Sequence, residues 1–236
     1  MSWLRRWRGE APPAPVTVPP PPPPPPAEIE HGAPGLRRAL ERLAKGGGSV
    51  LDLGPALAEN VAFFNGLHAR IRILDLEATL AEEGLWESSL PLPAWSQRAA
   101  AALAIDAEER FELVLAWDLL HYLGGERWSA VVAVLGRHVA PGGVIHLLAR
   151  TGKEMPARPG RFRIPAADLL RESPATGAFA PVPRFSHGEI EKLARGFAST
   201  VSYLDKHGLQ ELLLEHAEEL HLPPRAEAQP RPQRRR

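Results

Sequence analysis

Acidic residues and glycines stand directly after apolar runs in this chain of 236 residues. The stretch "VLDLGPALAEN", residues 50–60, carries Asp52 and Gly54 where its apolar run ends, and Asp75 ends the next run with Glu77 close behind. A carboxylate in such a position can accept both hydroxyls of a ribose, because its two oxygens match a vicinal diol. Any one of these acids could instead cap a helix or lie in a solvated turn. Their joint placement at the ends of apolar runs favours a binding site for a ligand that contains a ribose.

Side chains that could move a proton follow a later apolar run. The segment "FELVLAWDLLHYL" ends its run at Trp117, and His121 and Tyr122 come within the next five residues. A histidine is the most common general base, so His121 is the best-placed candidate and Tyr122 is the next. The alternative is that His121 only begins a helix. Asp106, after a preceding weaker run, is a further candidate for contact with a ligand.

Strand-like and helix-like patterns alternate between these residues. A helix with Leu36, Leu40 and Leu43 on one face is expected to end at Gly46–Gly48. Strands separated by helices of about 10 to 15 residues are typical of a parallel sheet with crossover connections. We expect five parallel strands, at residues 49–54, 71–75, 99–105, 111–117 and 144–149.

The last part of the ordered chain differs. Ser186 and Glu189 form a capping-box pattern for a helix through Leu193. Two apolar segments, "STVSYL" and "LQELLLEH", follow with only residues 205–208 between them, which predicts a hairpin and an antiparallel last strand. The expected fold class is α/β, a doubly wound and mostly parallel sheet of seven strands.

This series of motifs resembles the class I S-adenosylmethionine-dependent methyltransferases. In that family the first strand ends in an acidic residue followed by glycine-x-glycine-x-glycine, and the matching positions here are Asp52, Gly54, Ala56 and Ala58. The fourth-strand segment quoted above and the turn "PGG" at residues 141–143 match later family motifs. The resemblance covers about residues 35–216 and implies S-adenosylmethionine as cofactor, with a reversed last strand.

The resemblance also implies roles for individual residues. The ribose-binding acid would be Asp75, with Glu77 as the substitute if the strand ends later, and Asp106 would stand near the adenine. The other cofactor residues would be Asp52, Gly54, Ala56 and Trp117. The segment 150–184, basic in its first half, would cover the acceptor, and a solvated loop is the alternative account of it.

The chain departs from the family in its cofactor turn. Ala56 and Ala58 replace two glycines through which the backbone approaches the cofactor, and Pro55 removes an amide donor. An alanine held at positive φ costs about 1 to 2 kcal/mol, although this cost vanishes if the turn runs at negative φ. Two functions therefore stay open. One is methyl transfer to a small-molecule or lipid-like acceptor, and the other is a catalytically inactive interaction or regulatory protein.

The composition of the chain indicates what its two terminal segments are and which partners it has. Basic and acidic residues number 28 each and cysteine is absent, so we expect no specific nucleic-acid partner, no thiolate metal site and a cytoplasmic location. Prolines make up 11 of the 16 residues from 11 to 26, an extended spacer. Ahead of it, Trp3, Leu4 and Trp7 among arginines suggest that residues 1–26 reach a membrane surface or a protein partner. The expected division is a disordered peptide and linker at 1–34, a domain at 35–216 and a disordered basic tail at 217–236.

Overall fold

The computed structural model describes residues 27–43 and 48–216. The predictions for the N-terminal peptide and spacer at 1–26, for Gly46 and Gly47, and for the tail at 217–236 lie outside these residues. The described part begins earlier than the expected domain boundary, because residues 29–32 form a strand, β1 (Ile29–Gly32), that pairs with a distant partner. Residues 29–34 thus belong structurally to the folded unit and not to a linker.

A mixed sheet of six strands runs through the described domain in the order β10-β11-β5-β4-β2-β3. Its strands are β2 (Ser49–Asp52), β3 (Arg70–Ile73), β4 (Phe111–Trp117), β5 (Val139–Arg150), β10 (Phe197–Leu204) and β11 (Leu209–His216). The pairs among β3, β2, β4 and β5 are parallel, and β11 is antiparallel to both of its neighbours. The predicted hairpin and reversed last strand are confirmed.

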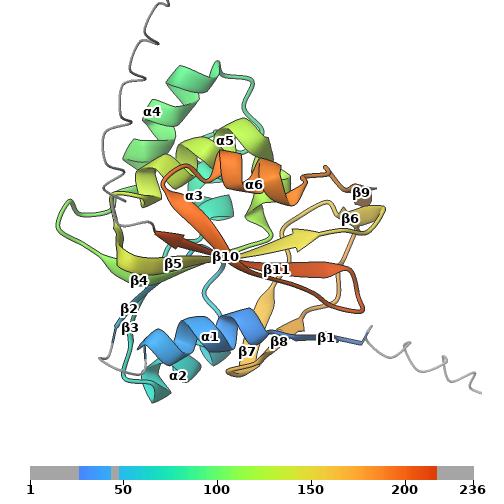
Figure 1. Cartoon of the computed structure of the whole chain (residues 1–236). Helices are drawn as coiled ribbons and strands as arrows, with labels where there is room; N and C mark the ends of the chain where they lie inside the picture. The colour runs from blue at the N-terminus through green and yellow to red at the C-terminus, as the bar shows by residue number, and fades with distance from the viewer. Residues whose placement is uncertain (1–26, 44–47, 217–236) are drawn as a thin grey trace, which may run out of the picture.

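Helices cover both faces of this sheet, as Figure 1 shows. On one face α1 (Pro34–Leu43) and α2 (Ala58–Gly66) enclose an apolar core with Phe64 and Leu113. On the other face lie α3 (Leu76–Glu82), α4 (Leu92–Leu103), α5 (Leu119–Leu135) and α6 (His187–Leu193), around a second core with Trp95 and Trp128. The doubly wound arrangement is thus confirmed, and α6 begins with the predicted capping box at Ser186 and Glu189.

The predicted third strand is wrong, and with it the count of seven strands in the main sheet. Residues 99–103 are the last turns of α4, and residues 104 and 105 lie outside any element. Trp95, Ala99 and Leu103 recur at intervals of four and are all buried, so they form one helix face against the core. Alanine is the strongest helix former, and this preference outweighs the apolar character that suggested a strand.

Two further boundaries differ from the prediction. Val139 begins β5, five residues before the predicted strand at 144–149, and the turn at residues 141–143 lies inside the bounds of β5. The pairing of β5 with β4 shifts between the Phe111–Val139 pair and the Leu113–Val144 pair, so residues 140–143 form an irregularity within the strand. The residues of "PGG" therefore form an irregularity within β5, an interior strand of the sheet, and not a separate loop.

The segment 150–184 contains strands where the sequence suggested a loop or lid. They are β6 (Glu154–Pro156), β7 (Phe162–Ala166), β8 (Leu169–Glu172) and β9 (Phe179–Pro181). The strand β1 joins β8 and β7 in a small antiparallel sheet, and β6 pairs with β9. Residues 154–181, called the insertion below, thus fold back onto the N-terminal strand.

One carboxylate connects the beginning of the described chain to its end. Glu211 on β11 is buried, and its two oxygens accept hydrogen bonds from the backbone N–H groups of Gly35 and Leu36, each at 2.7 Å. These amides belong to the first turn of α1, where N–H groups lack partners within the helix. Nε2 of His146 lies 2.6 Å from the same carboxylate. The N-terminus of the first helix is therefore capped by the last strand.

Candidate functional site

The acid at the end of β2 is already engaged by the protein itself. Asp52 is 1% exposed, and its Oδ1 accepts hydrogen bonds from the backbone N–H of Gly54 at 2.9 Å and from Nε1 of Trp117 at 2.6 Å. Burial raises the pKa of Asp52, and the hydrogen bonds from Trp117 and Gly54 oppose this shift. The carboxylate that the family resemblance assigned to the cofactor is thus bound to an indole.

Trp117 lies in the space next to the glycine turn. Its ring is 3% exposed and stacks on the ring of Phe162 from the insertion, with centroids 5.6 Å apart and planes at 11°. A Cβ placed on Gly54 would lie 2.6 Å from Nε1 of Trp117, so a side chain at position 54 would force the indole to shift. Gly54 permits the close approach of the indole, as a family glycine would permit the approach of a cofactor.

The backbone of Trp117 adopts a conformation that is unusual for such a residue. Its φ is 47°, in the left-handed region that a bulky side chain rarely occupies. Strain of this kind persists only where the surrounding contacts hold it, and here these are the Asp52 hydrogen bond and the Phe162 stack. The indole is therefore fixed in the site by specific contacts.

The two alanines of the turn do not obstruct the site. Neither Ala56 nor Ala58 has a positive φ, and both are exposed. Leu57, between them, is half-buried and precedes α2 in an extended conformation. The departure from the glycine pattern is thus tolerated by the backbone, and the ring of Trp117 is what fills the space.

The acids after β3 take part in structural contacts. Oδ1 of Asp75 accepts from the backbone N–H of Ala78 at 3.1 Å and so caps α3. Glu77 accepts from Nη1 of Arg158, which belongs to the insertion, at 2.7 Å. Burial raises the pKa of Glu77, while the charge of Arg158 opposes the rise. Asp106 is exposed, its backbone carbonyl accepts from the N–H of Glu109 in a turn, and it does not line the cavities described next.

A small cavity remains between these elements. Its volume is about 50 Å³, whereas pockets for drug-sized ligands measure about 300 to 1,000 Å³. Ten residues line it: Leu53, Gly54, Pro55, Asp75, Glu77, Trp117, Leu119, Pro159, Gly160 and Arg161. A neighbouring cavity of about 220 Å³ shares Glu77 and residues 159–161 and extends along the insertion. Four predicted cofactor residues therefore meet, but in the closed form they leave no room for S-adenosylmethionine.

The proposed general bases are both engaged in structural hydrogen bonds. Nε2 of His121 accepts from the backbone N–H of Arg150 at 2.7 Å, and Nδ1–H donates to the carbonyl of Pro183 at 3.0 Å. Burial lowers the pKa of His121 to about 4, so the ring is neutral at pH 7. The hydroxyl of Tyr122 donates to the carbonyl of Pro156 at 2.9 Å, and burial raises its pKa. The lone pair of the neutral His121 ring is thus occupied by the Arg150 amide, and the Tyr122 hydroxyl stays protonated and so cannot act as a base in this arrangement.

The pKa of His121 leads to a measurable pH dependence. Because its folded-state pKa lies below the ordinary 6.5, its contribution to stability is complete above about pH 6.5 and decreases as the pH falls towards 4. We expect His121→Gln to lower the free energy of unfolding at pH 7.5 by about 1 to 3 kcal/mol, the cost of an unmade buried hydrogen bond. Urea unfolding at pH 7.5 and 4.5 should show a smaller difference between wild type and variant at the lower pH. An unchanged difference would contradict this role, and the exposed His187→Gln is the control.

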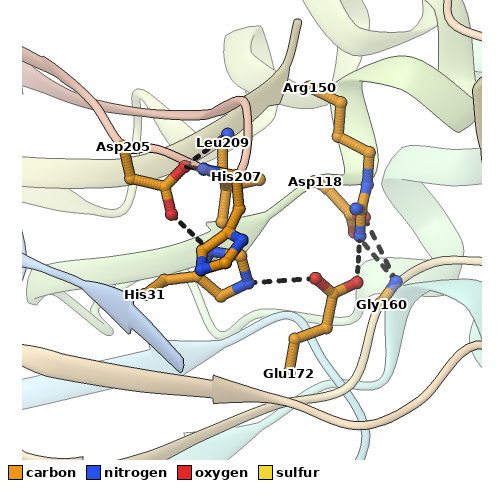
Figure 2. A network of polar contacts seen from close by, with 8 residues as sticks. All are labelled: His31, Asp118, Arg150, Gly160, Glu172, Asp205, His207 and Leu209. Carbon is orange, nitrogen blue, oxygen red and sulfur yellow. Dashed lines mark hydrogen bonds and ion pairs between the residues drawn. The ribbon is translucent and has the colours of Figure 1, made fainter. Parts of the chain in front are cut away.

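A buried polar network next to the site was not expected from the sequence (Figure 2). Asp118 is fully buried and lies against Arg150, with Nε and Nη2 at 2.8 and 2.7 Å from its Oδ2, and it accepts from the backbone N–H of Gly160 at 3.2 Å. Arg150 also contacts Glu172 on β8 at 2.6 Å, and the other oxygen of Glu172 lies 3.1 Å from Nε2 of His31 on β1. Burial raises the pKa of Asp118, although Arg150 opposes the shift.

The order of the strands, the antiparallel β11 and the acids at the strand ends agree with the arrangement expected from the class I methyltransferase resemblance, except that the predicted third strand at residues 99–105 is missing. No protein-family model matches the sequence, and no curated relative matches it either. Among the described residues no group of three or more His, Cys, Asp and Glu is arranged to hold a metal ion. Nor is any helix among them long and apolar enough to cross a bilayer.

Solved structures with a similar fold are S-adenosylmethionine-dependent methyltransferases. The 1,6-didemethyltoxoflavin-N1-methyltransferase of Burkholderia thailandensis, with bound S-adenosylhomocysteine, is 20% identical at a TM-score of 0.46 and 78% coverage of each chain. A TehB-like enzyme of Corynebacterium glutamicum is 11% identical, covering 78% of this chain and 88% of its own, at 0.43. The N-methyltransferase NodS of Bradyrhizobium japonicum is 15% identical, covering 78% and 86%, at 0.39. Likenesses at these identities concern the fold and leave the acceptor unassigned.

Proposed function

We propose that this chain is a methyltransferase-like protein without methyl-transfer activity, which serves as an interaction or regulatory protein. The observation that supports the proposal is the position of the Trp117 indole, hydrogen-bonded to Asp52 and packed against Gly54. A family cofactor would need this carboxylate and this space. The partner in this proposal is a protein or a membrane surface, reached through residues 1–26.

The closure involves the insertion as well as the indole. Phe162 stacks on Trp117, and Arg158 forms an ion pair with the carboxylate of Glu77. Residues 159–161 line the remaining cavity. The Trp117–Asp52 hydrogen bond and the contacts of the insertion with Trp117 and Glu77 would thus both have to break before a nucleoside could enter. Because His121 and Tyr122 are bound to backbone groups, neither of the two predicted general bases is available to a substrate in this arrangement.

Calorimetry with the cofactor tests the proposal. We expect titration of the full chain with S-adenosylmethionine or S-adenosylhomocysteine at about millimolar concentration to give no binding heat, since about 1 mM corresponds to roughly 4 kcal/mol of binding free energy. A purified methyltransferase of the same fold, such as NodS, serves as the positive control under identical conditions. Saturable binding in the micromolar range would contradict the proposal.

Methyl transfer to a small-molecule or lipid-like acceptor is the second candidate function. It is favoured by one observation: Asp75 and Glu77 remain together at the end of β3 and line cavities that continue along Arg158 and Arg161. In this case the insertion would open on cofactor binding, and the basic residues would face an anionic acceptor. The same titration decides between the two functions, because only an enzyme must bind the cofactor.

A further inference from the structure

We infer that β1 is a strap that holds the insertion closed over the ends of the parallel strands, and that the protonated ring of His31, which donates one N–H to each of two carboxylates, stabilises this closed arrangement. The inference concerns how the closed site is held and so goes beyond the proposed function. It rests on the observed closure and does not depend on whether the chain binds S-adenosylmethionine.

The geometry around His31 requires a proton on both ring nitrogens. Nδ1 lies 2.5 Å from Oδ2 of Asp205, and Nε2 lies 3.1 Å from Oε2 of Glu172. A neutral imidazole has one N–H and one lone pair, so one of these contacts would then place two acceptors against each other. Because His31 is 3% exposed, solvent has little access to relieve that repulsion. The imidazolium form is the one that satisfies both carboxylates.

The contacts of His31 join three parts of the chain that lie far apart in sequence. Glu172 belongs to β8 in the insertion, whereas Asp205 begins the turn between β10 and β11. Backbone pairing adds to this link, since β1 is antiparallel to β8 from the Ile29–Glu172 pair to the Gly32–Leu169 pair. His31 therefore connects the insertion to the main sheet through the N-terminal strand.

The network extends from His31 to the wall of the closed cavity. Glu172 forms an ion pair with Arg150, and Arg150 forms a second ion pair with Asp118. Asp118 in turn accepts a hydrogen bond from the backbone N–H of Gly160, as Figure 2 shows. Gly160 lines the small cavity beside Trp117, and a side chain at this position would displace Phe162 or Arg150, because a Cβ would lie 2.6 Å from Phe162 and 2.8 Å from Arg150. The state of His31 thus bears on the position of Gly160 through an unbroken series of charged contacts.

The charges of the network favour the protonated histidine. Three carboxylates, of Asp118, Glu172 and Asp205, face two cationic groups, Arg150 and protonated His31. Loss of the His31 proton leaves one cation for three buried or partly buried carboxylates. Like charges at short range in a site of low dielectric constant repel strongly, so the insertion is then held less firmly.

The other groups around the strap do not replace this proton. His207 contacts His31 edge-on, with ring centroids 5.5 Å apart, and the Phe162 ring from β7 lies at 6.3 Å. The remaining charged side chains near β1 are partly or fully exposed. Arg171 pairs with Glu28 and Glu30, Arg163 also pairs with Glu28, and Lys206 lines a surface pocket with Arg171. None of these surface pairs contacts the imidazole.

The direction of the pH dependence follows from these contacts. Burial lowers the pKa of His31, but hydrogen bonds with Glu172 and Asp205 and their charges outweigh it, so the pKa is raised above 6.5. A raised pKa in the folded state means that the contribution is complete below about pH 6.5 and is lost as the pH rises through the folded-state pKa. The contacts of His31 with Asp205 and Glu172 therefore hold β1 and the insertion together in mildly acidic solution and weaken in alkaline solution.

Amide hydrogen exchange of the full chain tests the strap. Compared with intrinsic exchange rates, we expect the protection of the Gly160 amide to fall by about tenfold or more between pH 6 and pH 8.5, the size of effect expected for loss of one charge-assisted hydrogen bond. His31→Gln, which cannot be protonated, should show the reduced protection at both pH values. His138→Gln is the matched control, because His138 is also buried but contacts the carbonyl of Glu109 outside the network.

Two results would overturn the inference. One is equal protection of Gly160 at both pH values in the wild type, a comparison that remains valid even if His31→Gln does not fold. The other is a loss of protection that includes the Trp95 amide in α4 to the same degree, which indicates general unfolding and not local release. Binding of S-adenosylmethionine in the calorimetric test would contradict the proposed function without changing either exchange result.

Discussion

Replacing Trp117 with alanine should lower the free energy of unfolding by about 3 to 5 kcal/mol, the range for truncation of a large buried aromatic side chain. The indole is 3% exposed and stacks on Phe162, and its N–H is the nearest donor to the buried carboxylate of Asp52. Alanine at φ 47° also retains part of the backbone strain, so no compensating gain is expected. Urea unfolding monitored by circular dichroism measures the change.

Trp117→Phe separates the two contributions of this side chain. Phenylalanine retains a ring against Phe162 but has no N–H for Asp52, so we expect a loss of about 1.5 to 3 kcal/mol, the value for a hydrogen bond to a charged group. The control is Trp86→Ala, a half-buried tryptophan packed at the edge of the other core, where a smaller loss is expected. A change below about 1 kcal/mol for Trp117→Ala would contradict the closed site, because an indole that moves freely contributes little to stability.

Replacing Arg150 should be comparably damaging for a different reason. Its guanidinium is the cation shared by Asp118 and Glu172, and the nearness of these two carboxylates raises its own pKa despite burial. Arg150→Ala leaves both carboxylates without this partner, and removal of one member of a buried ion pair costs about 3 to 5 kcal/mol. Urea unfolding at pH 7 measures this loss.

A second substitution distinguishes lost charge balance from lost packing. If the uncompensated carboxylate is the cause, Asp118→Asn combined with Arg150→Met should be more stable than Arg150→Met alone. Arg98→Ala is the control, since its pair with Glu83 is about half exposed on both sides and exposed pairs contribute about 0 to 1 kcal/mol. A double variant that is less stable than the single one would show that Asp118 does not need Arg150.

Local sequence patterns were sufficient to predict most of the main sheet. Its strongest strands are short apolar runs, such as residues 111–117, and the capping box at Ser186 is contained within four residues. The exception at residues 99–105 arose because a run of alanines suits a buried helix as well as a strand. The strand β1 was missed because its order depends on pairing with β8, about 140 residues away, and the four residues carry no alternating pattern of their own.

In the candidate site, too, features that depend on local sequence were predictable and features that depend on distant contacts were not. Asp52, Gly54, Asp75 and Trp117 were selected because ligands of such sheets bind beyond the strand ends. In the structure Gly54, Asp75 and Trp117 border one small cavity, and Asp52 is hydrogen-bonded to Trp117. The direction of the Trp117 ring was not predictable, since it depends on the insertion supplying Phe162. His31 and Glu172 likewise form a contact across 141 positions, and no local spacing indicates such a contact.

The cap on α1 also affects the order in which this protein can assemble on the ribosome. The N–H groups of Gly35 and Leu36 emerge early, whereas the Glu211 carboxylate that they bind is synthesised about 175 residues later. Until then the first turn of the helix has water as its partner, and β5 has no neighbour on its β11 side. Domains generally fold as units during synthesis, and here the unit is completed only by its last strand. A nascent chain stalled before residue 211 should therefore remain sensitive to protease within residues 34–43.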